Sequence, residues 1–154
     1  MNIRQANLGD FETVKRIVHT TINEVYPHYY PNGVVEFFIN YHSDNNIKES
    51  IEGDIVLLIS VDGVVVGTGS VHKNEISRVF VLPQFQGLGY GTLLMNELET
   101  LIEKEYSRIV LDSSLSAYNL YIRCGYRPIK YEKIITPNKD VLCYYTMEKT
   151  LKAN

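Results

Sequence analysis

The glycines at 87, 89 and 91 are the residues whose spacing most clearly indicates a chemical task. An apolar run ends at Pro83, and a helical pattern begins directly after the glycines. In such a strand–turn–helix connection, N–H groups without an intrahelical partner point outward, and the helix dipole adds to their attraction for anions. Because glycine has no Cβ, a diphosphate can approach this backbone closely. The turn therefore predicts a phosphate site, the alternative being a plain strand-to-helix connection.

The spacing of the turn distinguishes among phosphate ligands. A Walker loop would end in Gly-Lys-Ser/Thr and a dinucleotide loop would read G-x-G-x-x-G, whereas this turn reads Gln86-x-x-Gly89-x-Gly91. It resembles the Gln/Arg-x-x-Gly-x-Gly/Ala signature of the GNAT acyl-CoA N-acyltransferases, in which Val-x-x-Pro precedes the turn. Here the run Val-Phe-Val-Leu leads to Pro83. The resemblance implies acetyl-CoA as cosubstrate.

The resemblance assigns the coenzyme mainly to backbone groups. In this family the fourth strand splays from the fifth, and its free backbone groups bond the pantetheine arm as a neighbouring strand would. Carried over, this role falls to Val79, Phe80 and Val81, with an N–H near Val79 or Val81 directed at the thioester oxygen. The diphosphate is expected on the turn and the helix start, which comprise Gln86, Gly87, Leu88, Gly89, Tyr90, Gly91 and Thr92.

A tyrosine that can act as an acid follows further along the chain. Residues 117–126 resemble the family's Ala-x-x-Leu/Phe-Tyr-x-x-x-Gly-Phe/Tyr segment, which makes Tyr121 the expected general acid for the leaving thiolate. A phenol with a pKa near 10 is protonated at neutral pH and can donate that proton. The alternative is a tyrosine that only fills the core. The resemblance also points to Asn119 and Ser114 as pantetheine contacts, Ser114 standing where many relatives have asparagine.

Glu75 lies eleven residues before Gln86, the offset at which histone-modifying members of the family have a glutamate general base. The strand period puts Glu75 on the same face as Val79. An ideal strand separates the two by ~13 Å, so proton transfer needs a water relay or a bulge. An exposed carboxylate at the strand end is the other interpretation, and an amine that is already neutral needs no fixed base.

An aromatic segment, residues 26–31, interrupts the first helical pattern because proline cannot continue a helix. In the GNAT fold the first helix pair and its loop cover the acceptor side. We therefore expect Tyr26, His28, Tyr29 and Tyr30 to line the acceptor pocket, unless they pack the loop onto the sheet. His28 is the one of the four that could also take up a proton.

Hydrophobic periodicity predicts the elements that position these residues. Strands are expected over 3–6, 55–61, 64–71, 75–81, 109–111, 129–135 and 142–147, with a type I′ turn at Asp62-Gly63. Helices are expected over 8–25, with Asn7 as N-cap, and over 34–41, 88–106 and 115–124, with a further turn or two after Ser43. The order β-α-α-β-β-β-α-β-α-β-β predicts an α/β (α+β) protein: a mixed sheet of six to seven strands with helices on both faces, as in the GNAT fold.

Composition narrows the class of protein. A chain of 154 residues suits one domain, expected over 1–154. A net charge of −3 without a basic cluster argues against a nucleic-acid partner, and no apolar run reaches the ~20 residues of a membrane span. Two unspaced cysteines suit a reducing cytoplasm, and with scattered histidines they predict no metal site.

These features together predict an acetyl-CoA-dependent N-acetyltransferase. Its acceptor is expected to be the primary amine of a small molecule, attacking directly in a ternary complex, since no cysteine lies on the donor strand for a covalent relay. Two other interpretations stay open: a CoA-binding sensor or regulatory module, and a protein acetyltransferase that acts on an N-terminus or a lysine. Homodimers are common in this fold, so the resemblance also allows a homodimer.

Overall fold

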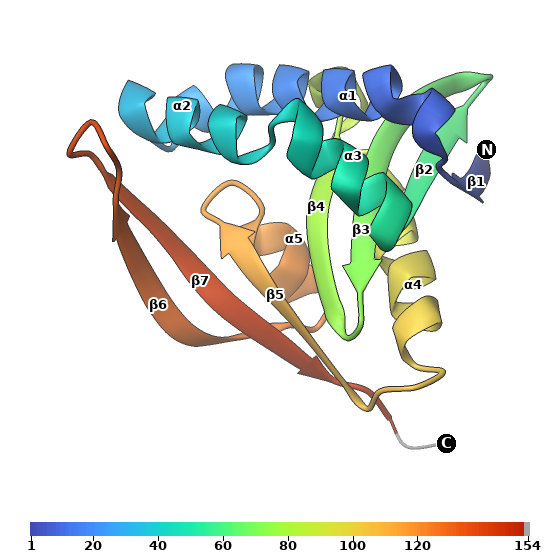
Figure 1. Ribbon diagram of the computed structural model, residues 1–154. Coiled ribbons are helices and arrows are strands. Elements are labelled where there is room, and N and C mark those ends of the chain that lie inside the picture. Colours follow the sequence, from blue (N-terminus) through green and yellow to red (C-terminus); the bar gives the residue numbers. More distant parts are fainter. Residues whose placement is uncertain (153–154) are drawn as a thin grey trace.

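The protein is built on one seven-stranded sheet, seen in a computed structural model that describes residues 1–152 (Figure 1). The strand order is β1-β2-β3-β4-β5-β7-β6, and every neighbouring pair is antiparallel except β4 and β5, which are parallel. This confirms the expected mixed sheet. The strands are β1 (Asn2–Gln5), β2 (Ile55–Val61), β3 (Val64–His72), β4 (Glu75–Val81), β5 (Arg108–Ser114), β6 (Arg127–Ile135) and β7 (Val141–Thr150).

Helices cover both faces of the sheet, with α1 to α3 on one face and α4 and α5 on the other (Figure 1). They are α1 (Phe11–Val25), α2 (Asn32–Tyr41), α3 (Asp44–Gly53), α4 (Tyr90–Ile102) and α5 (Tyr118–Arg123). The expected turn or two after Ser43 is a full helix, α3, whose start is capped because the Ser43 hydroxyl accepts from the Asn46 N–H at 3.2 Å. Within residues 1–152 no helix is both long and apolar enough to cross a membrane.

Two helices next to the predicted site are shorter than the periodicity predicts. α4 begins at Tyr90 because Gly89 before it has a φ of 89°, which no right-handed helix contains. α5 begins at Tyr118 because the chain after β5 first makes a tight turn, in which the Ser114 and Ser116 hydroxyls share a hydrogen bond of 2.8 Å. Gly125 follows α5 with a φ of 91°, as expected of a glycine at the C′ position.

The two faces of the sheet carry separate hydrophobic cores. One core packs α1, α2 and α3 against the sheet, and the α1 residues Val14, Ile17, Val18 and Ile22 are at most 1% exposed there. The other core packs α4 and the tyrosines of the α5 region against the opposite face. β4 contributes to both, with Ile76 in the second core and Phe80 in the first. The two are four residues apart and would share a face in a regular strand, but a bulge between Ser77 and Phe80 adds one residue and reverses the alternation. Each large apolar side chain buried in this way contributes about 1.5–3 kcal/mol.

A buried ion pair joins α4 to β7 on the α4 face. Glu99 is 8% exposed, and it accepts from the Tyr126 hydroxyl at 3.0 Å and from Lys149 Nζ at 2.8 Å. Both carboxylate oxygens are therefore satisfied, as a buried charge requires. The network holds the turn after α5, and with it the helix that carries Tyr121.

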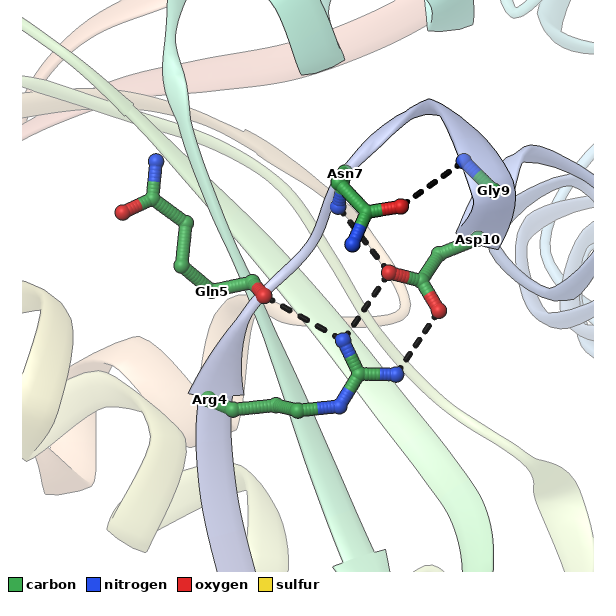
Figure 2. Close-up of polar contacts among 5 residues, drawn as sticks. All are labelled: Arg4, Gln5, Asn7, Gly9 and Asp10. Carbon is green, nitrogen blue, oxygen red and sulfur yellow. Dashed lines mark hydrogen bonds and ion pairs between the residues drawn. The ribbon is translucent and has the colours of Figure 1, made fainter.

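A polar cluster joins the end of β1 to the start of α1 (Figure 2). Arg4 donates to both Asp10 carboxylate oxygens, at 2.9 and 2.7 Å, and Asp10 also accepts from the Asn7 N–H at 2.9 Å. The Asn7 side chain accepts from the Gly9 N–H at 2.8 Å. Asn7 is thus a cap, as predicted, but it caps a short 3₁₀ turn (Leu8–Asp10) that leads into α1.

Candidate active site

A bulge interrupts β4 shortly before its apolar end. Two residues of β4, Arg78 and Val79, lie opposite the single residue Gly69 of β3. Arg78 has a φ of 52°, in the left-handed region that residues other than glycine rarely occupy. An extra residue of this kind bends the strand and increases its twist, so the end of β4 departs from the line of its first half.

β4 and β5 separate directly after Glu75, before the bulge. Their pairing is confined to Glu75 opposite Val110, where the Val110 N–H donates to the Asn74 carbonyl at 3.0 Å. The two strands diverge from this end, and α5 lies behind the gap (Figure 1). The separation that the resemblance implied is therefore present, and it leaves an unpaired strand edge inside the sheet.

Backbone direction decides which β4 groups face this gap. The Leu82 N–H donates to the Val66 carbonyl of β3 at 2.8 Å. Phe80 lies two residues earlier, so its backbone N–H and C=O also point toward β3. Since the C=O and N–H of one trans peptide unit point in opposite directions, the Val79 carbonyl and the Val81 N–H point into the gap. Of the three predicted pantetheine residues, Phe80 offers its side chain rather than its backbone.

The Val81 carbonyl also faces the gap, but protein groups occupy it. Gln86 Nε2 donates to it at 2.9 Å, and Thr21 Oγ1 of α1 lies within 3.4 Å. The Gln86 side chain thus ties the glycine turn to the end of β4. This contact gives a structural reason for a glutamine at position 86 of the motif, because the side chain holds the turn in place.

The glycine turn presents its N–H groups outward. Gly87 and Gly89 have φ values of 75° and 89°, a conformation that glycine adopts without steric cost. Within residues 1–152 no backbone N–H from Gly87 to Thr92 donates to another protein group, and the Leu93 N–H is the first to do so, bonding the Gly89 carbonyl at 3.1 Å. A run of free amides at the positive end of α4 is an anion site.

A cavity of about 600 Å³, which we call the donor cleft, extends over this turn and the β4–β5 gap. From the predicted coenzyme residues its lining includes Val79, Phe80, Val81, Gln86, Gly87, Gly89, Gly91, Thr92, Ser114 and Asn119. Leu88 and Tyr90 lie outside the lining, so they can contribute only backbone amides. The remaining lining residues are Thr21, Val25, Tyr26, Phe85, Ser116, Ala117, Leu120 and Arg123.

A second cavity, of about 230 Å³, lies on the α2 side of the same gap, and we call it the acceptor cavity. One wall is strand residues, including Glu75, Ser77 and Arg78 of β4 and Asp112 of β5. The facing wall is largely aromatic and apolar, and comprises Phe37, Phe38, Tyr41, Tyr144, Ile134 and Leu142. Its volume is below the about 300–1,000 Å³ usual for pockets that hold drug-sized ligands, which favours a small occupant.

The donor cleft and the acceptor cavity meet between the separated strands. Tyr26, Val79, Phe80, Ser114 and Ala117 line both. These shared residues lie beside the point where the Val79 carbonyl and the Val81 N–H enter the gap. Ligands in the two cavities can therefore come into contact at the middle of β4.

Tyr121 lines the acceptor cavity, one helical turn after Ala117, which lines both cavities. It lines the acceptor cavity rather than the donor cleft and is only 5% exposed. Its hydroxyl has no hydrogen-bond partner within residues 1–152, although it is not sealed from the cavity. Burial raises the pKa of Tyr121 above its ordinary value, so the phenol stays protonated across the physiological range.

The predicted acceptor residues of the aromatic segment divide into two groups. Tyr26 lines both cavities and packs edge-on against Phe38 at 4.8 Å between ring centres. The Tyr30 hydroxyl donates to the Cys143 carbonyl at 2.9 Å and accepts from the Leu115 N–H at 2.8 Å, so it ties the segment to the sheet. His28 and Tyr29 are exposed and line neither cavity. The structure therefore brings only Tyr26 of the four to the gap.

Several lining residues were missed by sequence reasoning. Arg78 is placed in the acceptor cavity by a backbone conformation that no sequence pattern signals. The α2 aromatics reach the cavity because that helix crosses over the gap, which is a tertiary feature. A signal did exist for Asp112, since alternation puts it on the same face of β5 as Ser114. Within residues 1–152 no group of three His, Cys, Asp or Glu side chains is arranged to hold a metal ion.

Comparison with known proteins defines the class. Residues 25–151 match the acetyltransferase (GNAT) domain family, so the chain belongs to the GNAT acetyltransferases. A curated relative, an N-alpha-acetyltransferase of Sulfurisphaera tokodaii, is 26% identical over 140 residues, covering 83% of this chain and 81% of that protein.

Solved structures share the fold. A GCN5-related N-acetyltransferase from Rhodopseudomonas palustris superposes with a TM-score of 0.90 at 22% identity, covering 97% of this chain and 95% of that one. The PaiA N-acetyltransferase of Thermoplasma acidophilum, solved in complex with coenzyme A, superposes with a TM-score of 0.73 at 18% identity, covering 97% and 98%. At these identities the likeness is one of fold.

Proposed function

We propose that the chain transfers the acetyl group of acetyl-CoA to the primary amine of a small molecule, by direct attack in a ternary complex. The observation that carries this proposal is the meeting of two cavities at the β4–β5 gap, one lined by free amides and the other by carboxylates and aromatic rings. A thioester bound on one side and an amine bound on the other would come together there without a covalent relay.

The residues present fit coenzyme A. Free amides from Gly87 to Thr92 suit the diphosphate, and the Val79 carbonyl and Val81 N–H suit an arm that itself carries amide groups. Ser114 and Asn119 line the same cleft and offer further polar contacts. Acetyl-CoA would supply an acetyl group activated as a thioester.

Two side chains are suited to move protons. Tyr121 holds its proton because burial disfavours the phenolate, and it lines the acceptor cavity close to the residues that both cavities share. Its hydroxyl, which has no partner within residues 1–152, would serve there as general acid for the departing sulfur. Glu75 lines the acceptor cavity as an exposed residue at the start of β4, where partial desolvation and the nearby Asp112 raise its pKa. That position suits a base that takes the amine's proton through water.

The test is release of free thiol from acetyl-CoA with amino acids, polyamines, aminoglycosides and short peptides as acceptors, beside calorimetric titration with CoA. We expect CoA to bind and at least one small amine to stimulate thiol release. CoA binding without acceptor-dependent release across the panel would support the sensor interpretation instead. Absence of CoA binding would overturn both.

A protein N-terminus is a second candidate acceptor. The observation that favours it is the curated relative, whose name is N-alpha-acetyltransferase. The small acceptor cavity favours the first candidate. In the same panel, turnover of peptides but not of free amino compounds would favour the second.

A further inference from the structure

Arg78 occupies a position in β4 at which glycine would be free of strain. Its φ of 52° belongs to the region that side-chain-bearing residues avoid, and it is one of the two residues that form the bulge. Strained residues of this kind cluster at binding and catalytic sites, where the surrounding structure holds them. The conformation places the Arg78 side chain in the lining of the acceptor cavity.

The guanidinium of Arg78 is held at one end and free at the other. Its Nε donates to His42 Nδ1 at 3.0 Å. His42 is 7% exposed, and burial lowers its pKa to about 3, so the ring is neutral and can accept this bond. The His42 carbonyl in turn lies 2.7 Å from His19 Nε2, which fixes the histidine. Within residues 1–152 no acceptor or carboxylate pairs with the Nη groups of Arg78, although the side chain is half-buried.

The acceptor cavity also holds negative charges that Arg78 does not neutralise. Glu75 and Asp112 line it, and neither forms an ion pair with Arg78. The Asp112 carboxylate accepts a hydrogen bond of 3.2 Å from the Thr146 hydroxyl. Both residues are exposed, and partial desolvation in the cavity wall raises the pKa of each carboxyl, a shift that a bound cation would oppose. Charges of both signs that form no ion pair within residues 1–152 therefore line one small cavity.

Resting on the proposed function, we propose that the acceptor is a zwitterionic amino compound of about amino-acid size. The two Nη groups of Arg78 form a planar fork that matches a carboxylate. Glu75 and Asp112 attract the ammonium before it loses its proton. The wall formed by Phe37, Phe38, Tyr41 and Tyr144 suits an apolar or aromatic side chain.

This assignment distinguishes the acceptor from two alternatives. A polyamine carries no anion, and its charge would be repelled by Arg78. A peptide N-terminus has an amide where an amino acid has its carboxylate, so the guanidinium fork would lose one charge-assisted partner. Arg78 is thus a binding and specificity residue for the carboxylate.

The experiment is calorimetric titration of the CoA-saturated protein with three probes that differ in charge. L-phenylalanine carries both charges, L-phenylalaninamide keeps only the ammonium, and 3-phenylpropionate keeps only the carboxylate. The series is repeated with L-leucine, L-leucinamide and 4-methylpentanoate. We expect the amino acid of at least one series to bind most tightly, with the amide weaker by about tenfold to a hundredfold, as for loss of a charge-assisted contact.

Variants of Arg78 assign the effect to its side chain. Arg78→Gln should weaken binding of the amino acid and of the carboxylate probe by a similar factor and leave binding of the amide probe nearly unchanged. Arg78→Lys should recover part of the lost affinity, because lysine keeps the positive charge but lacks the planar fork. Arg16→Gln, on the exposed face of α1, is the control and should change none of the affinities. CoA affinity should persist in every variant, which shows that the donor cleft is intact.

Three results would overturn the assignment. The first is that the amino acid and its amide bind with equal affinity. The second is that Arg78→Gln lowers the affinity for all three probes equally, and the third is that no probe of either series binds. Failure of the proposed function is measured by a different experiment: no amine would stimulate thiol release. The titrations measure binding and need no turnover, so the two failures can be distinguished.

Discussion

Among single residues, the glycines of the turn differ in what a side chain would meet. At Gly87 and Gly89 a Cβ would have no atom within 4 Å, but φ is positive at both. At Gly91 the φ is ordinary for any residue, and a Cβ would lie 3.3 Å from the Leu120 side chain. A side chain at Gly89 therefore strains the backbone that presents the amides, whereas one at Gly91 pushes α4 away from α5.

We predict that Gly89→Val weakens CoA binding by about tenfold or more, because relief of ~1–2 kcal/mol of strain turns the amides away from the diphosphate. The matched control is Gly63→Val in the β2–β3 turn, where φ is 79° and a Cβ would also meet nothing within 4 Å. Both variants should lose similar stability, and only Gly89→Val should lose affinity in calorimetry. Equal CoA affinity in the two would remove the diphosphate from this turn.

Tyr121→Phe deletes one hydroxyl that has no partner within residues 1–152. We expect folding and CoA affinity to be kept, because the ring still fills its place, and kcat to fall by about a hundredfold, as for loss of a general acid. Steady-state kinetics over a range of pH makes the measurement. A kcat that matched the parent protein at every pH would show that Tyr121 only fills the core.

At the scale of elements, the junction of β1 with α1 is predicted to respond to acid. Hydrogen bonds from Arg4 lower the pKa of Asp10 to about 2. Because the folded pKa lies below the unfolded one, the stabilisation is complete above about pH 4 and is lost as the pH falls towards 2. Asp10→Asn should cost about 1 kcal/mol at neutral pH, since an exposed partner limits the gain.

Urea unfolding at neutral pH and near pH 2.5 measures this effect. The difference between Asp10→Asn and the parent protein should shrink at the lower pH. The corresponding acid-to-amide substitution Glu97→Gln serves as the control, because Glu97 is exposed and has no side-chain partner within residues 1–152. A difference that stayed constant with pH would show that the Asp10 charge does not stabilise the junction.

Elements with strong local signals were predictable from sequence. The bounds of β2 and β4 agree with the apolar runs at 55–61 and 75–81, and the Asp62-Gly63 turn has positive φ at both residues, as a type I′ turn requires. Element ends were less predictable where a turn competed with a helix. The backbone conformation of Gly89 and the hydrogen bond between Ser114 and Ser116 each delayed the start of a helix.

The two cavities differed in how far sequence could describe them. The β4 and glycine-turn part of the donor cleft is formed by one stretch, residues 79–92, so a local pattern sufficed to find it. The part of its lining from α1 gave no such pattern. The acceptor cavity is assembled from α2, β4, β5 and the β6–β7 hairpin, which lie far apart in the chain. His28 and Tyr29 were expected there because the GNAT resemblance puts their loop over the acceptor side, yet both are exposed while Tyr26 and Tyr30 are buried.

For the whole molecule, CoA is predicted to stabilise the fold unevenly. CoA at about a hundred times its Kd should raise the free energy of unfolding by about 2.7 kcal/mol, because it binds the folded state alone. Hydrogen exchange should slow at the amides from Gly87 to Thr92 and at Val81, and much less in β1 and β2. Equal slowing of hydrogen exchange throughout the protein, or no slowing at the glycine turn, would contradict the proposed binding site of the coenzyme.

Among the described residues the two cavities share five lining residues, two of them in β4, and the rest of each lining comes largely from different elements. Each product can therefore leave through its own mouth, and neither has to wait for the other. This arrangement implies a random order of release. Spent CoA should then compete kinetically with acetyl-CoA but not with the amine, and the acetylated product should show the reverse pattern.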